Sequence, residues 1–256
     1  MGKIISIINQ KGGVGKTTTS VNLAAAVAET GKKVLLVDLD SQSNATSSYG
    51  ITGKELELSS YDLLISDADP KQAIIHTKHC DVDIIGSNID LAGAEIEMVV
   101  LEKREYLLKE ALNKVRHLYD FIFIDCPPSL GLLTLNALAA SNSILIPIQP
   151  EYFALEGVSK LINTVRQVKK SINPSLSMEG VLLTMYDGRL NLTLQVADEV
   201  KKYFEDKVYK TVIPRNVRLS EAPSHGMPVM TYDRYSRGAL TYRELAKEFL
   251  KAQEVI

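Results

Sequence analysis

The chain has 256 residues, 45% of them apolar, and a formal net charge of -2 at pH 7, which allows one large domain or a small two-domain protein with a substantial core. Residues 1–150 carry 13 Lys and Arg against 18 Asp and Glu, so any basic surface is expected in the C-terminal part. The two cysteines, Cys80 and Cys126, have no C-x-x-C spacing, so we expect neither a disulfide framework nor a cysteine-bound metal. Neither a signal peptide nor an apolar run of about 20 residues is present, so we expect a cytoplasmic protein.

A strand, a glycine-rich turn and a helix are predicted at the start of the chain. Residues 4–8 form a short β-branched run, and residues 17–30 have an alanine-rich helical character. The glycines between them let backbone N–H groups point at an anion, and the helix N-terminus adds positive dipole. We therefore predict a phosphate-binding loop, in which Lys16 reaches the phosphates and the Thr17 hydroxyl holds Mg²⁺. The nucleotide-contacting residues of this loop are predicted to be Lys11, Gly12, Gly13, Val14, Gly15, Lys16, Thr17 and Thr18.

The loop departs from the ordinary Walker A spacing. Position 10 is Gln where that spacing requires glycine, and a second lysine, Lys11, stands at the front of the loop. The form Lys-Gly-Gly-x-Gly-Lys-Thr resembles the deviant Walker A loop of the ParA/MinD family of dimeric ATPases. This resemblance implies that Lys11 reaches across a subunit interface to the nucleotide of a partner chain.

A second buried strand is predicted at residues 34–37 and leads into Asp38 and Asp40. Its carboxylates follow the C-terminal end of the strand, where ligands bind in parallel sheets, and both point to the same side if the extended conformation continues. The family resemblance implies that this is the first switch region. It assigns the orientation of the hydrolytic water to Asp40.

A Walker B pattern is predicted at residues 121–125, where four apolar residues end in Asp125. The carboxylate is placed to support, through water, the Mg²⁺ that Thr17 holds. Pro127 and Pro128 end the strand abruptly. The resemblance extends to this segment, since D-x-P-P-S marks the second switch of the family.

The remaining elements alternate between strands and helices. Helices are expected at residues 60–65, 70–78, 91–117 with a break near 102–104, 152–172, 190–204 and 239–253, and strands at 82–85, 143–150, 180–186 and 228–230. For the helix at 190–204, the predicted buried stripe is Leu192, Val196, Val200 and Tyr203. We expect one α/β domain over residues 1–256, a P-loop NTPase with a mostly parallel twisted sheet flanked by helices on both faces.

Two further sets of residues are assigned by the resemblance. Pro214, Arg215 and Asn216 match the loop that lies beside the adenine ring in the family, and the Asn amide can serve both donor and acceptor edges of the base. Arg189 and Arg218 lie in predicted turns and match basic positions implicated in DNA contact, where arginine would pair phosphates without reading sequence.

The implied activity is Mg²⁺-dependent ATP hydrolysis by a homodimer, with Lys11, Lys16 and Asp40 as catalytic residues. In the ParA/Soj branch, the ATP-bound dimer binds non-specific DNA and a ParB/Spo0J-like partner stimulates hydrolysis, which implies a nucleoid-associated protein of chromosome or plasmid partition. In the alternative MinD branch, the dimer binds membrane through a basic amphipathic C-terminal helix. Residues 245–256 mix Lys with Glu, which favours DNA over stable membrane association. The chain starts at the first strand, so no helix-turn-helix extension and no operator recognition are expected.

Overall fold

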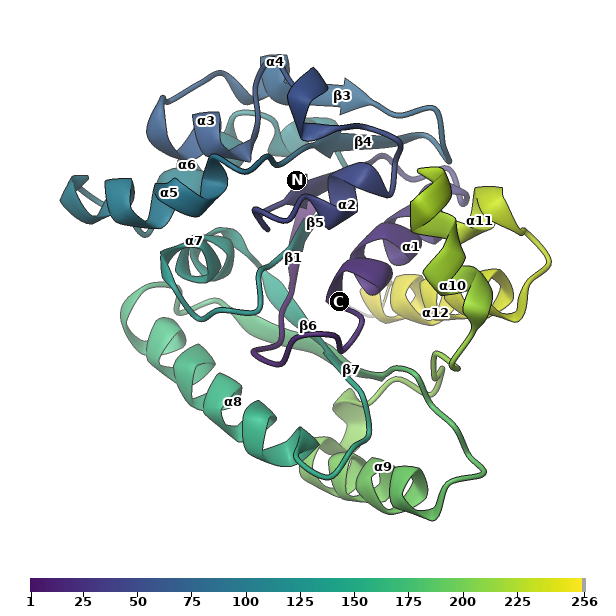
Figure 1. The fold of residues 1–256 in the computed structure, drawn as a ribbon. Helices are drawn as coiled ribbons and strands as arrows, with labels where there is room; N and C mark the ends of the chain where they lie inside the picture. The colour runs from purple at the N-terminus through teal and green to yellow at the C-terminus, as the bar shows by residue number, and fades with distance from the viewer. Residues whose placement is uncertain (255–256) are drawn as a thin grey trace.

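Seven strands form one sheet in the order β3-β4-β2-β5-β1-β6-β7 in the computed structural model, which describes residues 1–254 (Figure 1). The strands are β1 (Lys3–Ile7), β2 (Val34–Asp38), β3 (Ile74–His76), β4 (Val82–Ile85), β5 (Phe121–Asp125), β6 (Ser143–Ile148) and β7 (Ser177–Leu183). Every neighbouring pair is parallel except β3 and β4. The predicted mostly parallel sheet is therefore confirmed, with an antiparallel strand at one edge.

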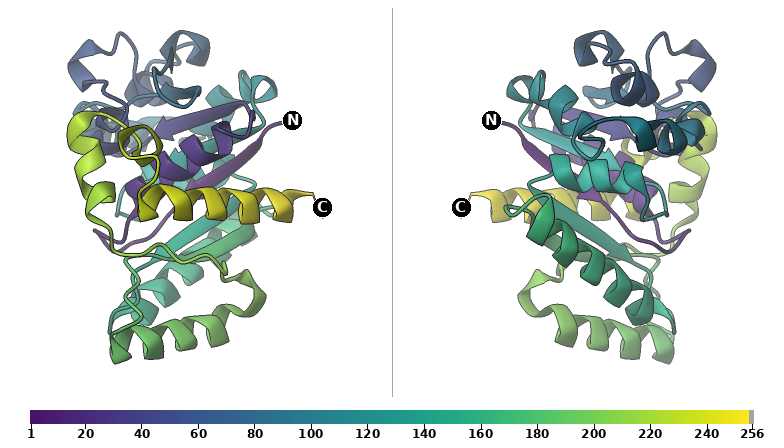
Figure 2. Two further views of the ribbon diagram at one scale, coloured as in Figure 1. Left: turned by 90° about the vertical axis from the view of Figure 1, so that its right-hand side faces the viewer. Right: turned by 90° about the vertical axis from the view of Figure 1, so that its left-hand side faces the viewer.

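Helices cover both faces of this sheet (Figure 2). The α-helices are α1 (Lys16–Ala28), α2 (Asn44–Ser47), α3 (Ser60–Ile65), α4 (Pro70–Ala73), α5 (Leu91–Glu97), α6 (Leu107–Asn113), α7 (Leu132–Ala140), α8 (Ala154–Ser171), α9 (Asn191–Phe204), α10 (Val217–Glu221), α11 (Val229–Tyr232) and α12 (Arg237–Gln253). The short 3₁₀ helices are η1 (Gly53–Glu55), η2 (Met98–Val100), η3 (Arg116–Leu118), η4 (Glu205–Lys207) and η5 (Ala222–His225).

The sheet separates two hydrophobic clusters, because successive side chains of a strand point to opposite faces. Ile5 and Ile7 of β1 pack with α1 and α10 to α12, whereas Ile4 packs with α3 and α5 to α9. The apolar face of α12, with Tyr242, Leu245 and Phe249, is buried in the first cluster. Of the C-terminal segment interpreted above, Val255 and Ile256 lie outside the described residues.

The helix predicted over residues 70–78 is wrong in its second half. α4 ends at Ala73, and β3 follows, with Ile75 opposite Ile84 of β4. Ile74 and Ile75 are β-branched and fit an edge strand better than a continued helix.

The strand predicted at residues 228–230 is also wrong, because Val229–Tyr232 forms α11. The Val229 amide donates a hydrogen bond of 2.8 Å to Asn22 Oδ1 on α1, and Val229 and Met230 are buried in the helical layer. This segment lies over a helix and not beside a strand edge, so its β-forming composition is overridden by the packing against α1.

The helical region at residues 91–117 is divided into α5, η2, α6 and η3, with turns across the predicted break at 102–104. The stripe predicted for α9 is wrong in two of four positions, since Leu192 is 46% and Tyr203 is 51% exposed. The buried residues are Thr193, Val196, Ala197, Val200 and Phe204. The predicted and the observed stripe both have helical spacing. The stripe that includes Phe204 is the one packed into the core.

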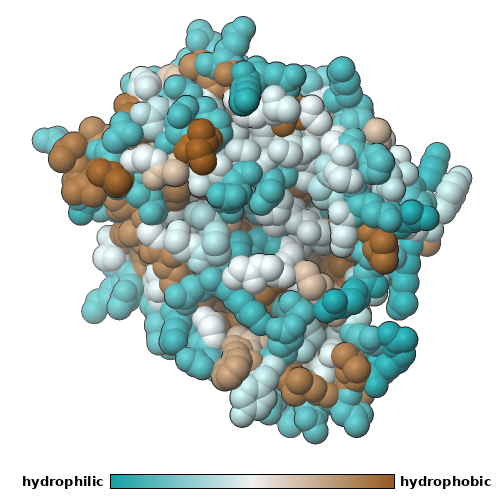
Figure 3. Space-filling model, viewed as in Figure 1, coloured by the Kyte–Doolittle hydropathy of each residue, from teal (hydrophilic) through white to brown (hydrophobic). Residues whose placement is uncertain are grey.

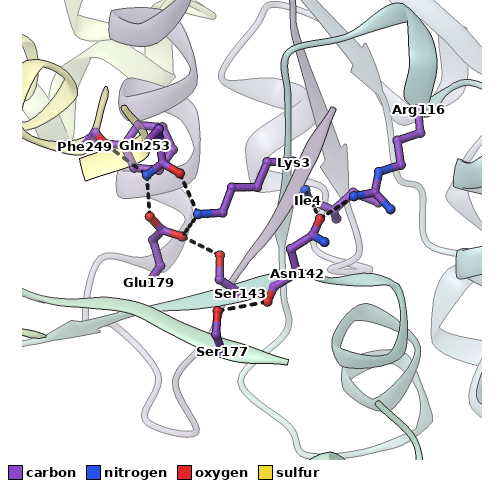
Figure 4. A network of polar contacts seen from close by, with 9 residues as sticks. All are labelled: Lys3, Ile4, Arg116, Asn142, Ser143, Ser177, Glu179, Phe249 and Gln253. Carbon is purple, nitrogen blue, oxygen red and sulfur yellow. Dashed lines mark hydrogen bonds and ion pairs between the residues drawn. The ribbon is translucent and has the colours of Figure 1, made fainter. Parts of the chain in front are cut away.

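A polar network closes the edge of the sheet opposite to the strand C-termini (Figure 4). Lys3 Nζ donates to Gln253 Oε1 and pairs with Glu179 Oε2, each at 2.6 Å. Gln253 Nε2 in turn donates to Glu179 Oε1 at 2.6 Å. Because Glu179 is almost fully buried, this network fixes α12 against β1 and β7. Within residues 1–254, no helix has the length and apolar composition required to cross a bilayer.

Candidate nucleotide-binding site

The predicted phosphate loop connects β1 to α1. Gly13 and Gly15 have positive φ angles of 72° and 84°, a conformation that glycine adopts without steric cost. Gly15 precedes the first turn of α1, whose free N–H groups face the loop. The loop is tied to the end of β7, because Thr184 Oγ1 donates to the Val14 carbonyl at 2.8 Å. The backbone is therefore arranged to receive an anion.

Lys16 lies in this loop with only 7% of its surface exposed. Its Nζ donates to the Lys11 carbonyl at 3.3 Å. Burial lowers the pKa of Lys16, while the charge of Asp125 opposes that shift. The Lys16 side chain is thus held against the loop, where its Nζ can pair with phosphate.

Asp125 ends β5 next to Asp38, which ends β2, and the two residues are directly paired in the register of the sheet. Burial, together with the charge of the neighbouring Asp38, raises the pKa of Asp125 to about 7. Ser20 Oγ donates to Asp125 Oδ1 at 2.8 Å, whereas Oδ2 has no hydrogen-bond partner among residues 1–254. A buried carboxylate oxygen without a partner is suited to a hydrated cation, so these residues fit the predicted Mg²⁺.

The donor set around Asp125 also fits magnesium chemically. Among residues 1–254, no group of three or more His, Cys, Asp and Glu is placed to hold a metal by itself. Mg²⁺ binds through one or two protein oxygens together with water and substrate phosphates. Thr17 and Asp125 are thus sufficient as protein partners for an ion that arrives with its nucleotide.

Asp38 and Asp40 have different environments. Asp38 is fully buried and its Oδ2 accepts hydrogen bonds from the Thr46 amide at 2.9 Å and the Thr46 hydroxyl at 2.7 Å. Burial raises the pKa of Asp38 to about 6. Asp40 is partly exposed and its Oδ1 accepts from the Gln42 amide at 3.0 Å, because the chain turns there instead of continuing as a strand. Asp38 therefore positions α2, and Asp40 is the accessible carboxylate.

The loop predicted to contact adenine lies beside the phosphate loop. A cavity of about 510 Å³ is lined by Gly15 and Thr18 on one side and by Pro214, Arg215 and Asn216 on the other. Asn216 Oδ1 accepts a hydrogen bond from the Arg218 amide at 3.0 Å, because Asn216 caps α10. Because Oδ1 is engaged in this cap, a donor role of the side-chain NH₂ toward a base is favoured over the expected dual role.

Lys11 is separated from the residues of this cavity. Its Nζ pairs with Glu151 Oε2 at 2.6 Å, and both side chains are partly exposed. The aromatic side chains of Tyr152 and Phe153, which follow directly, are 76% and 66% exposed. The Lys11 ammonium therefore lies at the outer surface of the chain, paired with Glu151, and Lys11 does not line the cavity described above.

The two arginines assigned to DNA contact are exposed and paired with carboxylates. Arg189 donates two hydrogen bonds to Asp187, at 2.8 and 2.7 Å, and these lower the pKa of the Asp187 carboxyl to about 2. Arg218 pairs with Glu221 at 2.8 Å and with Asp233 at 3.4 Å. Both guanidinium groups must exchange or share these partners to contact a phosphate.

Two residues of the site were not identified from the sequence. Ser20 lies one helical turn after Lys16, so a helical projection of α1 would have placed its hydroxyl on the same face. Glu151 is 140 positions from Lys11, and no local pattern predicts their pairing.

A loop that binds phosphate at the N-terminus of α1, with carboxylates at the ends of two adjacent parallel strands, is the arrangement by which P-loop NTPases hold Mg²⁺ and nucleoside triphosphate. The fold and the site place the chain in this class. Comparison with known proteins makes the placement more specific.

The family model described as an AAA domain matches residues 2–178. The sporulation initiation inhibitor protein Soj of Bacillus subtilis (strain 168) is 63% identical over 248 residues, which cover 97% of this chain and 98% of Soj. The chromosome partitioning protein ParA of Myxococcus xanthus (strain DK1622) is 50% identical over 252 residues, covering 98% of this chain and 89% of that protein. The chain belongs to the Soj/ParA family of partition ATPases.

A solved structure supports the assignment of ATP and Mg²⁺ as the ligands. Cobyrinic acid a,c-diamide synthase from Mycobacterium smegmatis, determined with a bound ATP analogue and magnesium, has a TM-score of 0.87 and 37% identity, covering 99% of this chain and 96% of that chain. The nucleotide-binding fold is thus shared along essentially the full length of the two chains.

Proposed function

We propose that this chain is an ATP-dependent dimerising switch of chromosome or plasmid partition. In its ATP-bound dimeric state it binds DNA without sequence preference, and a ParB/Spo0J-like partner stimulates hydrolysis and release. The single observation that supports the dimer is the position of Lys11, whose ammonium pairs at the surface with Glu151, the residue that precedes the exposed Tyr152 and Phe153. A partner chain seated there would receive this lysine.

The residues of one chain divide the work of hydrolysis. Mg²⁺ bound with ATP neutralises charge on the transferred phosphate. Lys16 and the loop amides hold the phosphates, Thr17 and Asp125 support the hydrated ion, and Asp40 orients the attacking water. Lys11 of the partner chain neutralises developing charge, a contribution of about 10³–10⁵ in rate for groups supplied in trans to well-studied NTPases. Hydrolysis is therefore slow until the dimer forms.

The DNA-binding surface is proposed to include Arg189 and Arg218 of both chains. Four phosphate contacts give a slope of about -3.6 for the logarithm of affinity against the logarithm of salt concentration, or a loss of about 100-fold between 50 and 200 mM salt. The membrane-binding alternative has less support, because the apolar face of α12 is buried against α1 and the relatives are partition proteins. We propose a single ATPase domain that is nucleoid-associated in the cytoplasm.

The test is binding of the full chain to a non-specific DNA duplex with ATP, ADP or no nucleotide at two salt concentrations. Asp40→Ala is used to trap the ATP dimer, and Lys16→Ala is the control that removes nucleotide binding. Arg189→Glu should weaken DNA binding and leave ATP-dependent dimerisation unchanged. Binding that does not depend on ATP, or attachment of the ATP form to anionic vesicles instead of DNA, would contradict the proposal.

A further inference from the structure

An exposed apolar stripe runs along α5 and η2, far in the sequence from the nucleotide-contacting residues. Ile89, Ile96, Val99 and Val100 are 70%, 78%, 54% and 84% exposed. They recur with Ala92 at intervals of three and four residues, on the side opposite to the buried Leu91, Ala94 and Met98. Figure 3 shows hydrophobic side chains gathered at this edge of the molecule, over α5 of Figure 1. A helix of this kind has one face in the core and a second apolar face that no part of residues 1–254 covers.

Carboxylates outnumber basic groups in the segment that carries this stripe. Residues 88–105 contain Asp90, Glu95, Glu97, Glu102 and Glu105 but only two basic residues, Lys103 and Arg104. Of the two, Arg104 is engaged by Glu105 Oε1 at 3.3 Å and by the Val99 carbonyl at 2.7 Å. An apolar stripe with an acidic rim complements a segment that carries both apolar and basic side chains.

We propose that the stripe formed by Ile89, Ala92, Ile96, Val99 and Val100 is the docking surface for a basic, apolar segment of the protein that stimulates ATP hydrolysis. The inference rests on the proposed function, which requires such a partner. A second copy of this chain is disfavoured as the occupant, since a symmetric contact would bring two acidic rims together. Anionic lipid and DNA are disfavoured for the same electrostatic reason.

The same helix contacts the start of α7, which follows directly after the second switch and so connects the docking surface to the chemistry. Glu95 Oε1 accepts a hydrogen bond of 3.2 Å from the Leu133 amide at the start of α7. The Glu95 carboxylate also occupies the space that a side chain at Gly131 would need. Gly131 ends the segment that begins at Asp125, so a displacement of α5 changes the position of the chain that follows the metal-supporting carboxylate. Glu95 acts here as a positioning residue.

The experiment measures steady-state ATP hydrolysis by the full chain with Mg²⁺, a non-specific duplex and increasing amounts of the purified ParB-like protein of the same organism. In the test variant, Ile96→Ser is combined with Val100→Ser. In the matched control, Leu118→Ser is combined with Leu240→Ser, two leucines that are 41% and 48% exposed on η3 and α12. The test variant is expected to need at least about tenfold more partner for half-maximal stimulation, with basal hydrolysis and DNA binding unchanged. The control is expected to match the wild type.

Glu95→Ala separates docking from coupling. We expect the partner concentration at half-maximal stimulation to stay within about twofold of the wild type, while the maximal stimulated rate falls. A purely structural role of Glu95 would lower the melting temperature and leave the ratio of stimulated to basal rate intact.

Three results would overturn the inference. If the partner stimulates the wild type and the Ile96/Val100 variant equally, the docking surface is elsewhere and the proposed function stands. If that variant loses ATP-dependent dimerisation in sedimentation velocity, the stripe is a contact between copies of this chain. If the partner does not stimulate the wild type at all, the proposed function fails and the inference fails with it.

Discussion

Replacement of Ser20 by alanine tests how the metal-supporting carboxylate is held. The buried Ser20 hydroxyl lies 2.8 Å from Asp125 Oδ1 and 3.0 Å from the Lys16 carbonyl four residues earlier, and Oδ2 of Asp125 has no hydrogen-bond partner among residues 1–254. A hydrogen bond to a charged group contributes about 1.5–3 kcal/mol, and each 1.4 kcal/mol corresponds to a factor of ten. Ser20→Ala should therefore weaken the binding of Mg²⁺ with ATP by about 10- to 150-fold, in the range typical for groups that orient metal ligands.

The assay is a fluorescence titration of a fluorescent ATP analogue at fixed concentration while Mg²⁺ is varied. Ser171→Ala is the control, because the Ser171 hydroxyl makes the same type of bond to a carbonyl four residues earlier, at 2.9 Å, but contacts no carboxylate. Circular dichroism checks that both variants are folded. A Mg²⁺ dependence of Ser20→Ala that superimposes on the wild type would refute the reasoning, because Asp125 would then be oriented without the serine.

Three further outcomes are expected. Burial raises the pKa of Asp125 to about 7, so the folded chain binds a proton that the unfolded chain releases near pH 4. The free energy of unfolding of the nucleotide-free protein should therefore fall as the pH rises from about 4 to about 7, and Asp125→Asn should flatten this dependence in thermal melts. Glu151→Gln releases Lys11 from an exposed ion pair that contributes about 0.2–1 kcal/mol. In sedimentation velocity, ATP-dependent dimers of this variant should therefore form at up to about fivefold lower protein concentration. Weaker dimerisation would instead assign Glu151 to the interface. Phe249 is fully buried against two phenylalanines of β5, with 5.1 and 5.7 Å between ring centroids. Phe249→Ala should lower the free energy of unfolding, measured in urea, by about 3–5 kcal/mol. A loss below about 1 kcal/mol would mean that α12 contributes little to the core.

The parts of the site that the sequence predicted are those set by local chemistry. The glycines of the phosphate loop, the apolar run before Asp125 and the proline pair after it each determine the backbone within a few residues. The parallel sheet then brings Asp38 and Asp125 together, because both end neighbouring strands in register. These features follow from composition and spacing, so the mostly parallel sheet and the location of the nucleotide edge could be inferred, whereas the order of the strands was not predicted.

The parts that were missed depend on contacts between distant segments. Ser20 meets Asp125 across 105 positions, and Lys11 meets Glu151 across 140. α11 packs against α1, where Asn22 accepts a hydrogen bond from the Val229 amide, and it is helical although its own residues favour a strand. In α9, the predicted stripe and the observed stripe have the same helical period, and the structure buries the one that includes Phe204. Local pattern carries no information about any of these contacts.

The central position of β1 has a consequence for synthesis of the protein. β1 is the first strand to leave the ribosome, yet its neighbours are β5, which pairs Phe121 with Lys3, and β6, which pairs Ser143 with Ile5. The cavity further requires Pro214 and Asn216. At about 5–20 residues per second, translation takes about 10–40 s to proceed from the first strand to this loop. The phosphate loop has no neighbouring strands until β5 and β6 have been synthesised, and the cavity lacks the residues of its adenine side until residue 214 has been added. A nascent or truncated chain that ends before residue 214 should therefore not retain ATP.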